Sequence, residues 1–418
     1  MRILIISFAY PPLNAIGAFR ASKISKYLTE MGHDVHVLSA NSNVTGAKSD
    51  LELEEGRIHY VDYFDLYSYI SPLIESKFKV LSFLGRGLRY FISPGSNRLP
   101  DWRRALWVSP AYRKGVELIK EHNIDLIYSS SSPPACSIIA SKLAKQCNVR
   151  WISEFRDAWC LNPYNTRSRI AHLLECRYEK KILSPAEALV TVSKPIAKVL
   201  SKMHNKVCHV IFNAYDKEDY STKENVEKDK FTIVHTGSIY PGKRDPTPLF
   251  KALSTMIAND PTIADLVEVN LYGHRQERLL KPVVDNLGIA SIVNFKGGVS
   301  KAESIKAQKK ATILLLLTWN NRIAEGTITG KLFEYIAAAR PILALSYPGV
   351  IKEVLESDNM GVVINETEHI KSFLLESIQH WKKEEMSLGG YNDNLGAREK
   401  YNWNHQVSKL SKILQNGN

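Results

Sequence analysis

Short runs of apolar residues alternate with longer segments of amphipathic, helix-like spacing along most of this chain. The pattern begins with the apolar run 2–8, continues with apolar residues at helical spacing over 18–31, and returns to an apolar run at 35–39. Runs without polar alternation are typical of strands buried on both faces, and the order strand, helix, strand predicts a parallel sheet. Further strands are expected at 124–129, 151–155, 188–193, 207–212, 231–236, 267–272, 292–295, 312–317, 342–345 and 361–364.

The length of the chain and a charged segment near its middle predict two domains. A chain of 418 residues is long enough for two domains of about 200 residues, each with its own core. The segment 220–230 is rich in charge and poor in apolar residues, as linkers are. No apolar run reaches the roughly 18 residues of a membrane span, and the run 1–6 is too short for a signal peptide. We therefore expect a cytoplasmic protein.

The charge balance and the cysteines narrow the function further. Lys and Arg number 55 against 43 Asp and Glu, a net charge of +12, which favours an anionic partner such as nucleic acid, acidic lipid or a phosphorylated substrate. The cysteines are odd in number and lack CxxC or Cys/His ligand spacing, which argues against a disulfide framework and a structural zinc. We expect free thiols at Cys136, Cys147, Cys160, Cys176 and Cys208.

The segment 64–120 mixes basic residues with aromatic and aliphatic ones, including Trp102 and Trp107. Basic residues interleaved with aromatic rings suit an interfacial helix on an anionic membrane, and they also suit nucleic acid. The alternative is a helical excursion whose apolar face joins the core while its basic face is solvated.

The strongest chemical signal is the stretch 325–341, where a turn rich in Gly and Thr runs into an amphipathic helix between two expected strands. Unpaired backbone N–H groups and the positive end of the helix dipole make such a turn an anion site. The turn residues Gly326, Thr327, Thr329 and Gly330 have the backbone donors and hydroxyls to wrap a diphosphate. Glu334, one turn inside the helix, is placed to accept both hydroxyls of a ribose. The alternative is that Thr329 caps an ordinary helix and Glu334 is a solvated acid.

The segment 326–335 resembles the signature Gly-Thr-x-x-Gly-Lys-Leu-Phe-Glu-Tyr of retaining glycosyltransferases of family 4 with the GT-B fold. Arg156-Asp157-Ala158-Trp159 is similar to the Arg-Asp-x-Trp signature of the same branch. The resemblance implies an α/β protein with two Rossmann-like domains facing each other across a cleft. It implies transfer of a sugar from a nucleotide-diphosphate-sugar, with UDP or GDP as the nucleotide, without metal or cofactor. The acceptor it implies is a lipid-linked or surface-polysaccharide intermediate, at the inner face of the cell membrane.

The resemblance also implies the domain boundaries. Residues 1–215 are expected to form an acceptor-binding domain, with a linker at 216–230, and 231–397 a nucleotide-sugar-binding domain. The segment 398–418 resembles the closing helix that crosses back to the first domain.

Matching the family motifs to this sequence assigns site residues in three groups. Residues expected in catalysis are Asp157, Lys243 and Glu325, and residues expected to meet the acceptor are Arg156 and Trp159. Donor-binding residues are expected to be Gly17, Gly237, Ser238, Lys243, Arg244, Arg275, Gly326, Thr327, Ile328, Thr329, Gly330, Lys331 and Glu334. The sequence departs from the family where serines stand in place of a cleft His after 124–129, and where Gly326 stands in place of the first motif Glu.

These departures keep two other functions open. A nucleotide-sugar epimerase of the same fold would need acids and a His around the sugar, and a non-catalytic nucleotide-sugar-binding partner of another transferase would tolerate their loss. The structural reading of Arg156 and Asp157 is a local ion pair with Trp159 packed beside it. Nucleic acid binding would leave the stretch 325–341 unused, and no GxGxxG fingerprint for a dinucleotide is present.

Overall fold

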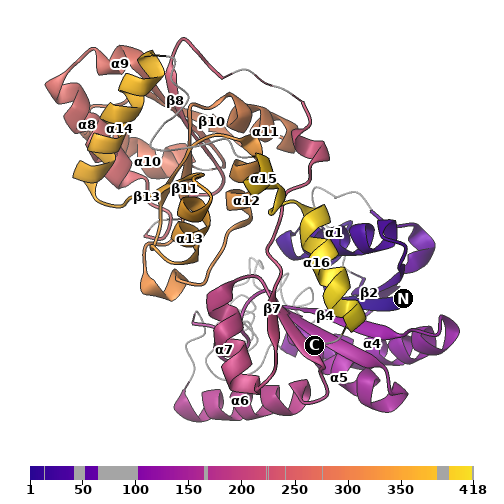
Figure 1. The fold of residues 1–418 in the computed structure, drawn as a ribbon. Coiled ribbons are helices and arrows are strands. Elements are labelled where there is room, and N and C mark those ends of the chain that lie inside the picture. The colour runs from indigo at the N-terminus through magenta and orange to yellow at the C-terminus, as the bar shows by residue number, and fades with distance from the viewer. Residues whose placement is uncertain are drawn as a thin grey trace, which may run out of the picture. The chain divides into compact units, whose positions relative to one another are not determined.

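Two parallel β-sheets organise the chain in the computed structural model (Figure 1). The structure describes residues 1–13, 15–41, 52–64, 102–163, 168–222, 224, 226–240, 242–274, 276–383 and 395–416. The chain divides into two compact units, the first formed by Met1–Phe212 with Gln406–Asn418 and the second by Asn213–His405.

The first unit holds a sheet of seven parallel strands in the order β3-β2-β1-β4-β5-β6-β7. Its elements are β1 (Arg2–Ser7), α1 (Ile16–Glu30), β2 (Asp34–Ala40), the 3₁₀ turn η1 (Glu55–Arg57), β3 (Ile58–Val61), α4 (Trp102–Glu121), β4 (Leu126–Ser131), α5 (Ala135–Cys147), β5 (Arg150–Phe155), α6 (Arg169–Leu183), β6 (Ala188–Thr191), α7 (Lys194–His204) and β7 (Cys208–Val210).

The second unit holds a sheet of six parallel strands in the order β10-β9-β8-β11-β12-β13. Its elements are η2 (Glu218–Tyr220), β8 (Phe231–Thr236), α8 (Thr247–Asn259), α9 (Ile263–Leu266), β9 (Val267–Tyr272), α10 (Gln276–Asn286), β10 (Val293–Gly297), α11 (Lys301–Lys310), β11 (Ile313–Leu317), η3 (Arg322–Ala324), α12 (Gly330–Ala338), β12 (Ile342–Leu345), α13 (Val350–Ser357), β13 (Gly361–Val363), α14 (Thr367–Lys382) and α15 (Leu395–Glu399).

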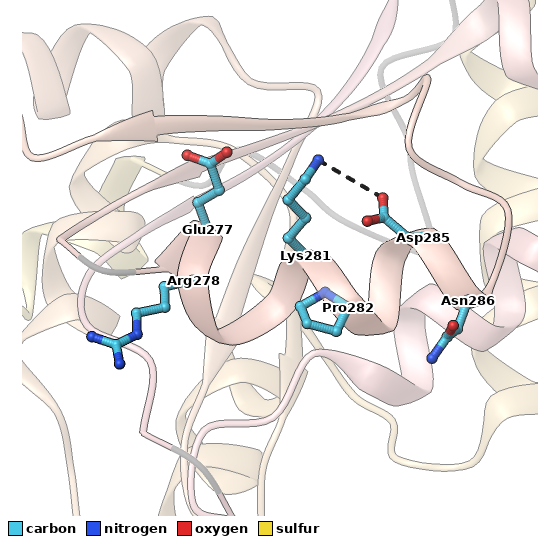
Figure 2. A pocket seen from close by; sticks show the side chains of 6 residues that line it. All are labelled: Glu277, Arg278, Lys281, Pro282, Asp285 and Asn286. Atoms are coloured by element: carbon cyan, nitrogen blue, oxygen red, sulfur yellow. Dashed lines mark ion pairs between the residues drawn. The ribbon is translucent and has the colours of Figure 1, made fainter.

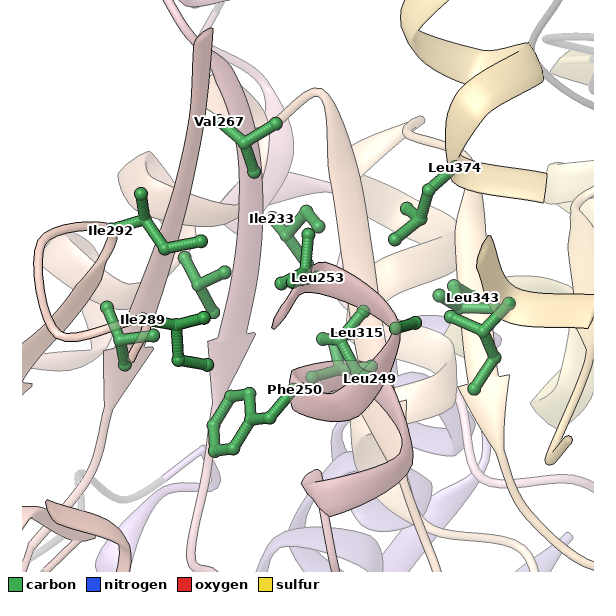
Figure 3. Packing of buried hydrophobic residues seen from close by; sticks show 14 of the residues in the cluster. Ile233, Leu249, Phe250, Leu253, Val267, Ile289, Ile292, Leu315, Leu343 and Leu374 are labelled. Carbon is green, nitrogen blue, oxygen red and sulfur yellow. The ribbon is translucent and has the colours of Figure 1, made fainter. Parts of the chain in front are cut away.

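Strands β8, β11 and β12 are buried over their whole length, as the continuous apolar runs of the sequence predict. Helices α8 and α14 pack against each other, and Figure 3 shows Leu253 of α8 beside Ile233 of β8, with Leu374 of α14 on the side of Leu343 of β12. Because both faces of a parallel sheet must be covered, the alternation of strand and helix produces this layered core.

The last helix, α16 (Trp403–Asn416), runs from the second unit into the first. Within the first unit, Ser411 Oγ lies 2.8 Å from His33 Nε2, and Gln406 Oε1 accepts a hydrogen bond of 2.8 Å from the Phe212 backbone. The segment 216–222, which the sequence predicts to lie in the linker, contains η2 and belongs to the second unit.

The predicted α/β fold of two Rossmann-like domains is confirmed in its architecture. Most predicted strands are found with shifts of one or two residues at their ends, and 231–236, 267–272 and 342–345 are found without any shift. Strand β3 was missed, because a strand of four residues at the edge of the sheet with His59 and Tyr60 in it has no apolar run.

Candidate functional site

Each sheet has one point where the strand order reverses, and the candidate residues gather at these two points. In the first sheet β1 lies between β2 and β4, and in the second β8 lies between β9 and β11. Chains leaving the carboxyl ends of such neighbouring strands depart to opposite faces, which opens a crevice where ligands bind in open α/β sheets. The segment 237–246 follows β8, and the segment 318–329 follows β11 and leads into α12.

Helix α12 begins with an open N-terminus at this point of the second sheet. Thr329 is its N-cap, and its hydroxyl accepts from the Lys331 backbone at 3.4 Å. Among the described residues the N–H of Gly330 has no hydrogen-bond partner, and a Cβ built on Gly330 meets no atom within 4 Å. The helix therefore presents an unpaired donor beside open space, the arrangement that accepts an anion.

Glu334 lies one turn into α12, where it is held between two side chains. Its Oε2 accepts a bond of 2.7 Å from Lys331 Nζ and one of 3.1 Å from Gln308 Nε2. Lys331 and Glu334 are 33% and 37% exposed, so Glu334 is neither buried nor simply solvated. Gln308 is a fully buried amide in α11, and no local motif in the sequence marks it as part of a site.

A buried polar layer lies under the loop that follows β8. The Tyr335 hydroxyl accepts from the Thr236 backbone at 2.8 Å, and Gln308 Nε2 donates to Thr236 Oγ1 at 3.0 Å. His235 Nδ1 lies 2.9 Å from the Leu315 carbonyl oxygen, and burial lowers the pKa of this imidazole to about 4. This layer ties β8, α11 and α12 together, so the loop rests on a fixed base.

Three cations converge on the loop after β8. Lys331 Cε lies 3.9 Å from the position of a Cβ on Gly237, and Arg244 and Lys331 both act on His235 electrostatically. Arg244 also donates to the Ser238 carbonyl at 3.1 Å. Lys243 lies with its Nζ 4.8 Å from the centre of the Trp319 ring, which comes from the segment after β11. Positive charge thus comes from the loop after β8 and from the first turn of α12, and the segment after β11 contributes the Trp319 ring.

Some backbone groups of the turn before α12 are already hydrogen-bonded within the protein. The Thr327 backbone donates to the Ala324 carbonyl at 2.9 Å, and the Glu325 carbonyl accepts from Val350 at 3.1 Å. Ile328 is 8% exposed, so its side chain belongs to the core and only its backbone could meet a ligand. The Glu325 side chain is exposed. Arg275, also expected at the donor, lies outside the described residues.

In the first unit, Arg156 packs directly on Gly17. A Cβ on Gly17 would lie 1.9 Å from Arg156 Nη1, so this glycine leaves room for the guanidinium. Arg156 Nε donates to the Ser131 carbonyl at 3.3 Å and Nη2 donates to the Ser132 carbonyl. Burial lowers the pKa of Arg156. The ends of β4 and β5 and the start of α1 therefore meet at this guanidinium.

Asp157 follows Arg156 and is exposed. Desolvation by the surrounding protein raises the pKa of its carboxyl, and the neighbouring Arg156 opposes that shift. A carboxylate with a raised pKa is a better proton acceptor near neutral pH than an ordinary aspartate.

Trp159 is placed differently from the expected acceptor contact. It is 9% exposed, and its indole N–H donates to Glu175 Oε1 of α6 at 2.9 Å. The structure gives it a packing role between this loop and α6, and contact with an acceptor remains a prediction.

The expectation of five free thiols is wrong for two of them. Cys160 and Cys176 form a disulfide between the loop after β5 and helix α6, while Cys136, Cys147 and Cys208 are free. The Cys160 backbone also donates to Glu179 Oε2 at 2.7 Å. The two cysteines are 16 residues apart, and only the path of the chain back along α6 brings them together, which spacing rules do not capture.

A buried ion pair stands behind the end of β5. Arg20 donates to Glu154 Oε1 at 2.6 Å, and both side chains are almost fully buried, at 2% and 0% exposed. Tyr128 donates to the same oxygen at 2.6 Å, and Ser130 donates to the other at 2.5 Å. Burial opposes ionisation of Glu154, but Arg20 overcomes that penalty, and the pKa of Glu154 lies below its ordinary value. The pair positions the strand end that carries Arg156.

The serines that stand where the family has a cleft His are mostly internal. Ser129, Ser130 and Ser131 are buried, and Ser131 Oγ lies 2.7 Å from Ser137 Oγ. Only Ser132 is exposed at this strand end. The buried serines at this strand end therefore belong to a hydroxyl network inside the unit.

Two further features lie apart from the reversal points. A surface hollow on α10 is lined by both signs of charge, and two of its lining residues, Lys281 and Asp285, form an ion pair along the helix (Figure 2). One helix of mixed charge offers no convergent polar groups, so this hollow is not a candidate site.

The basic segment 64–120 is described only at Phe64 and over 102–120. Trp107 of α4 is fully buried and meets Phe8 edge to face at 5.2 Å between ring centroids. That part of the segment therefore fits the core-facing alternative, and the stretch 65–101 lies outside the described residues. In the part of the chain that the structure describes, no helix combines the length and apolarity needed to cross a membrane.

Comparisons with known proteins agree with the fold of the chain. Residues 20–219 match the model for Glycosyltransferase Family 4. A glycosyltransferase from Rickettsia africae superposes with a TM-score of 0.66 at 15% identity, covering 100% of this chain and 98% of its own. HepE of Anabaena in complex with UDP gives a TM-score of 0.65 at 14% identity, covering 99% of this chain and 100% of its own.

The fold is also found outside the transferases. A protein from Listeria monocytogenes described as a putative UDP-N-acetylglucosamine 2-epimerase gives a TM-score of 0.57 at 10% identity, covering 99% of this chain and 95% of its own. No curated protein matches the chain.

Proposed function

Because this chain is a glycosyltransferase with a family 4 domain and the GT-B fold, we propose that it moves a sugar from a nucleoside diphosphate to an acceptor hydroxyl with retention of configuration. The observation that carries this proposal is the meeting of three cations with an open helix N-terminus at the strand-order reversal of the second sheet. A diphosphate needs such charges when no metal ion is bridged to it. UDP is the first nucleotide to test, since the HepE structure holds UDP.

The donor would exchange one ion pair for two contacts. In the structure Lys331 is paired with Glu334, and both side chains are about one third exposed. Pairs of this exposure stabilise a protein by only about 0–1 kcal/mol, so separating them costs little. Lys331 is then free for a phosphate oxygen and Glu334 for the ribose hydroxyls. Gln308 keeps Glu334 in place during the exchange, because it holds the same carboxylate oxygen from the buried side.

In the reaction the bond from the anomeric carbon to the diphosphate breaks while a bond to the acceptor oxygen forms on the same face. Negative charge grows on the departing diphosphate, where Lys243, Arg244 and the N-terminus of α12 stabilise it more than they stabilise the bound donor. The acceptor proton passes to the departing phosphate or to Asp157, whose raised pKa suits that role. Arg156 and Glu325 are assigned to acceptor and sugar positioning.

The acceptor is proposed to be lipid-linked, and helix α6 supports this part. Its outer face exposes Ile170 at 73%, Leu173 and Leu174 at 59% each, and Tyr178 at 46%. Basic residues Arg169, Arg177, Lys180 and Lys181 lie on the same helix. Apolar side chains beside cations are what a helix lying on an anionic membrane presents.

Helix α6 is fixed to the loop that carries Asp157. The disulfide Cys160–Cys176 and the hydrogen bond from Trp159 to Glu175 join them. A membrane held at α6 would therefore lie close to the acid proposed to act on the acceptor, which favours an acceptor anchored in lipid over a soluble one.

The donor site is tested by calorimetry with a panel of nucleoside diphosphates and their sugars in the presence of EDTA. Lys243→Ala and Glu334→Gln are expected to weaken binding of the best ligand about 10- to 150-fold, the cost of one charge-assisted hydrogen bond. Lys281→Ala, a lysine of the same unit on α10, is the matched control and should bind as the wild type does. Equal binding by all four proteins would refute the donor site.

Product analysis then separates transfer from the alternatives. The proposal is supported if NMR of the product shows the sugar on a lipid-linked acceptor with the same anomeric configuration as in the donor. Conversion of the free nucleotide-sugar to its epimer would identify an epimerase. Donor binding without turnover on any acceptor would identify a non-catalytic partner.

The membrane contact is tested by flotation with vesicles of phosphatidylglycerol. The pair Leu173→Glu and Leu174→Glu should release the protein, whereas Leu395→Glu, an equally exposed leucine of the second unit, should not. Neutral vesicles should bind weakly, because each basic residue near an anionic surface contributes about 1 kcal/mol.

A further inference from the structure

Three histidines from three different elements lie together in the first unit. His36 is on β2, His59 is on β3, and His122 follows the last residue of α4. Each histidine offers one ring nitrogen, and these three nitrogens all lie within 4.8 Å of one another. His36 Nδ1 is 3.2 Å from His59 Nε2, and the rings of His36 and His122 stack at 3.8 Å between centroids.

The cluster is separate from the proposed transferase site. His36 is the third residue of the seven in β2, whereas Gly17 and Arg156 lie beyond the carboxyl ends of β1 and β5. In open α/β sheets, ligands bind outside the carboxyl ends of the strands. The three histidines therefore have no part in the binding of donor or acceptor.

Two carboxylates and two basic side chains surround the cluster. Asp34 Oδ1 lies 3.7 Å from His36 Nε2, and Glu121 Oε1 lies 3.8 Å from His122 Nε2. Arg57 pairs with Asp34 and removes part of that negative charge, and Lys114 acts on His59 from α4. The two carboxylates therefore lie next to two of the three rings, where they would stabilise a bound cation.

From this arrangement we infer that His36, His59 and His122 bind one divalent transition-metal ion, with zinc as the best fit. Zinc takes imidazole ligands at 2.0–2.1 Å in tetrahedral geometry, which places two ligand nitrogens about 3.3 Å apart. The 3.2 Å between His36 and His59 matches that spacing. Magnesium and calcium prefer oxygen ligands, so a set of three imidazoles selects against them.

The ligand shell follows from the side chains. Three imidazoles leave a fourth position for water, and the carboxylate of Asp34 stands behind the ring of His36 as carboxylates commonly do behind zinc-bound histidines. The stacked rings of His36 and His122 must turn about χ2 so that both lone pairs point to one ion. His59 and His122 are only partly buried, which leaves room for ring rotation.

The ion would tie β2, β3 and the end of α4 to one another. Strand β3 has only four residues and lies at the edge of the sheet. Its backbone hydrogen bonds to the sheet are therefore few, and a metal ion would hold it in place more firmly. Since metal binding to the folded state alone stabilises it, 100-fold excess over the dissociation constant adds about 2.7 kcal/mol. The inferred role is structural.

The test uses the full chain without an affinity tag, stripped with a chelator and titrated with Co²⁺ and Zn²⁺. One equivalent of Co²⁺ should give the visible absorption of a tetrahedral nitrogen site, and Zn²⁺ should displace it and raise the melting temperature. His59→Gln and His122→Gln should each weaken binding about 100-fold or more. His369→Gln, which changes an exposed histidine of α14, is the matched control and should keep full binding.

Circular dichroism of the metal-free variants shows whether each is folded, which separates loss of a ligand from loss of structure. Absence of a one-to-one complex in the wild type would overturn the inference and leave three neighbouring rings, two of them joined by a hydrogen bond. Unchanged binding in the folded His59→Gln and His122→Gln proteins would overturn it as well. Nucleotide binding is measured in parallel, and its outcome is independent of the metal result.

Discussion

Replacing Gly330 by alanine should raise stability and lower donor affinity at the same time. Gly330 is the first residue of α12, and a Cβ there meets no atom within 4 Å. Alanine is favoured over glycine in a helix by up to about 1 kcal/mol. For a unit of this size that gain corresponds to a melting temperature about 2–4 °C higher.

The effect on the donor has the opposite sign. If the diphosphate lies over the open N-terminus, the added methyl group occupies the space through which it approaches the Gly330 N–H. Loss of one hydrogen bond to a charged group costs about 1.5–3 kcal/mol, or about 10- to 150-fold in the dissociation constant. The two effects cannot both come from damage to the fold, because damage lowers stability.

The assay is calorimetric titration with the best nucleoside diphosphate, together with thermal unfolding of the ligand-free protein. Gly56→Ala is the matched control, since a Cβ at Gly56 also meets no atom within 4 Å and the residue lies in the first unit. It should leave donor affinity unchanged. A Gly330→Ala protein that melts higher and binds the nucleotide as tightly as the wild type would refute the close approach of the diphosphate to α12.

Three other predictions concern the support of the two sites. Glu154→Gln should lower the free energy of unfolding by about 3–5 kcal/mol in urea, because it leaves Arg20 charged and buried, and adding Arg20→Met should recover part of the loss. Gly17→Ala should displace the flexible guanidinium of Arg156 with little loss of stability; sugar transfer should fall while donor affinity stays, and unchanged transfer would contradict the role of Arg156. The pKa of His235 is lowered to about 4 by burial, so the unfolded state binds more protons between pH 6.5 and 4 and stability falls as pH falls through this window. The free energy of unfolding should fall by about 3 kcal/mol between pH 6.5 and pH 4. Urea titrations at these two pH values should show no such fall in His235→Gln.

The elements of the fold were predictable because parallel strands buried on both faces leave continuous apolar runs. Segments such as 231–236 and 267–272 contain this signal in full. The start of α12 was also predictable, since Thr329 caps the helix as a local pattern suggests. Lys331 pairs with Glu334 only three residues away, within the reach of sequence reasoning.

The missed features depend on residues far apart in the chain. Gln308 reaches Glu334 across 26 residues, and Arg20 reaches Glu154 across 134. No periodicity or motif links such pairs, because their contact exists only after the sheet has formed. The histidine cluster has the same origin, with partners from two strands and a helix end. Sequence patterns therefore locate the loops of a site more readily than the buried groups that hold those loops in place.

Two departures from the family pattern bear differently on the proposed reaction. Ser129, Ser130 and Ser131 are bonded inside the first unit, so no side chain at that strand position other than the exposed Ser132 can meet a ligand. Gly326 removes a carboxylate from the turn before α12 but leaves Glu325 exposed one residue earlier. A transferase that stabilises a departing diphosphate with cations and a helix N-terminus needs neither group as a nucleophile. We infer that these changes alter which sugar is accepted rather than whether transfer occurs, because cations lie around Gly237 and the N-terminus of α12 is open.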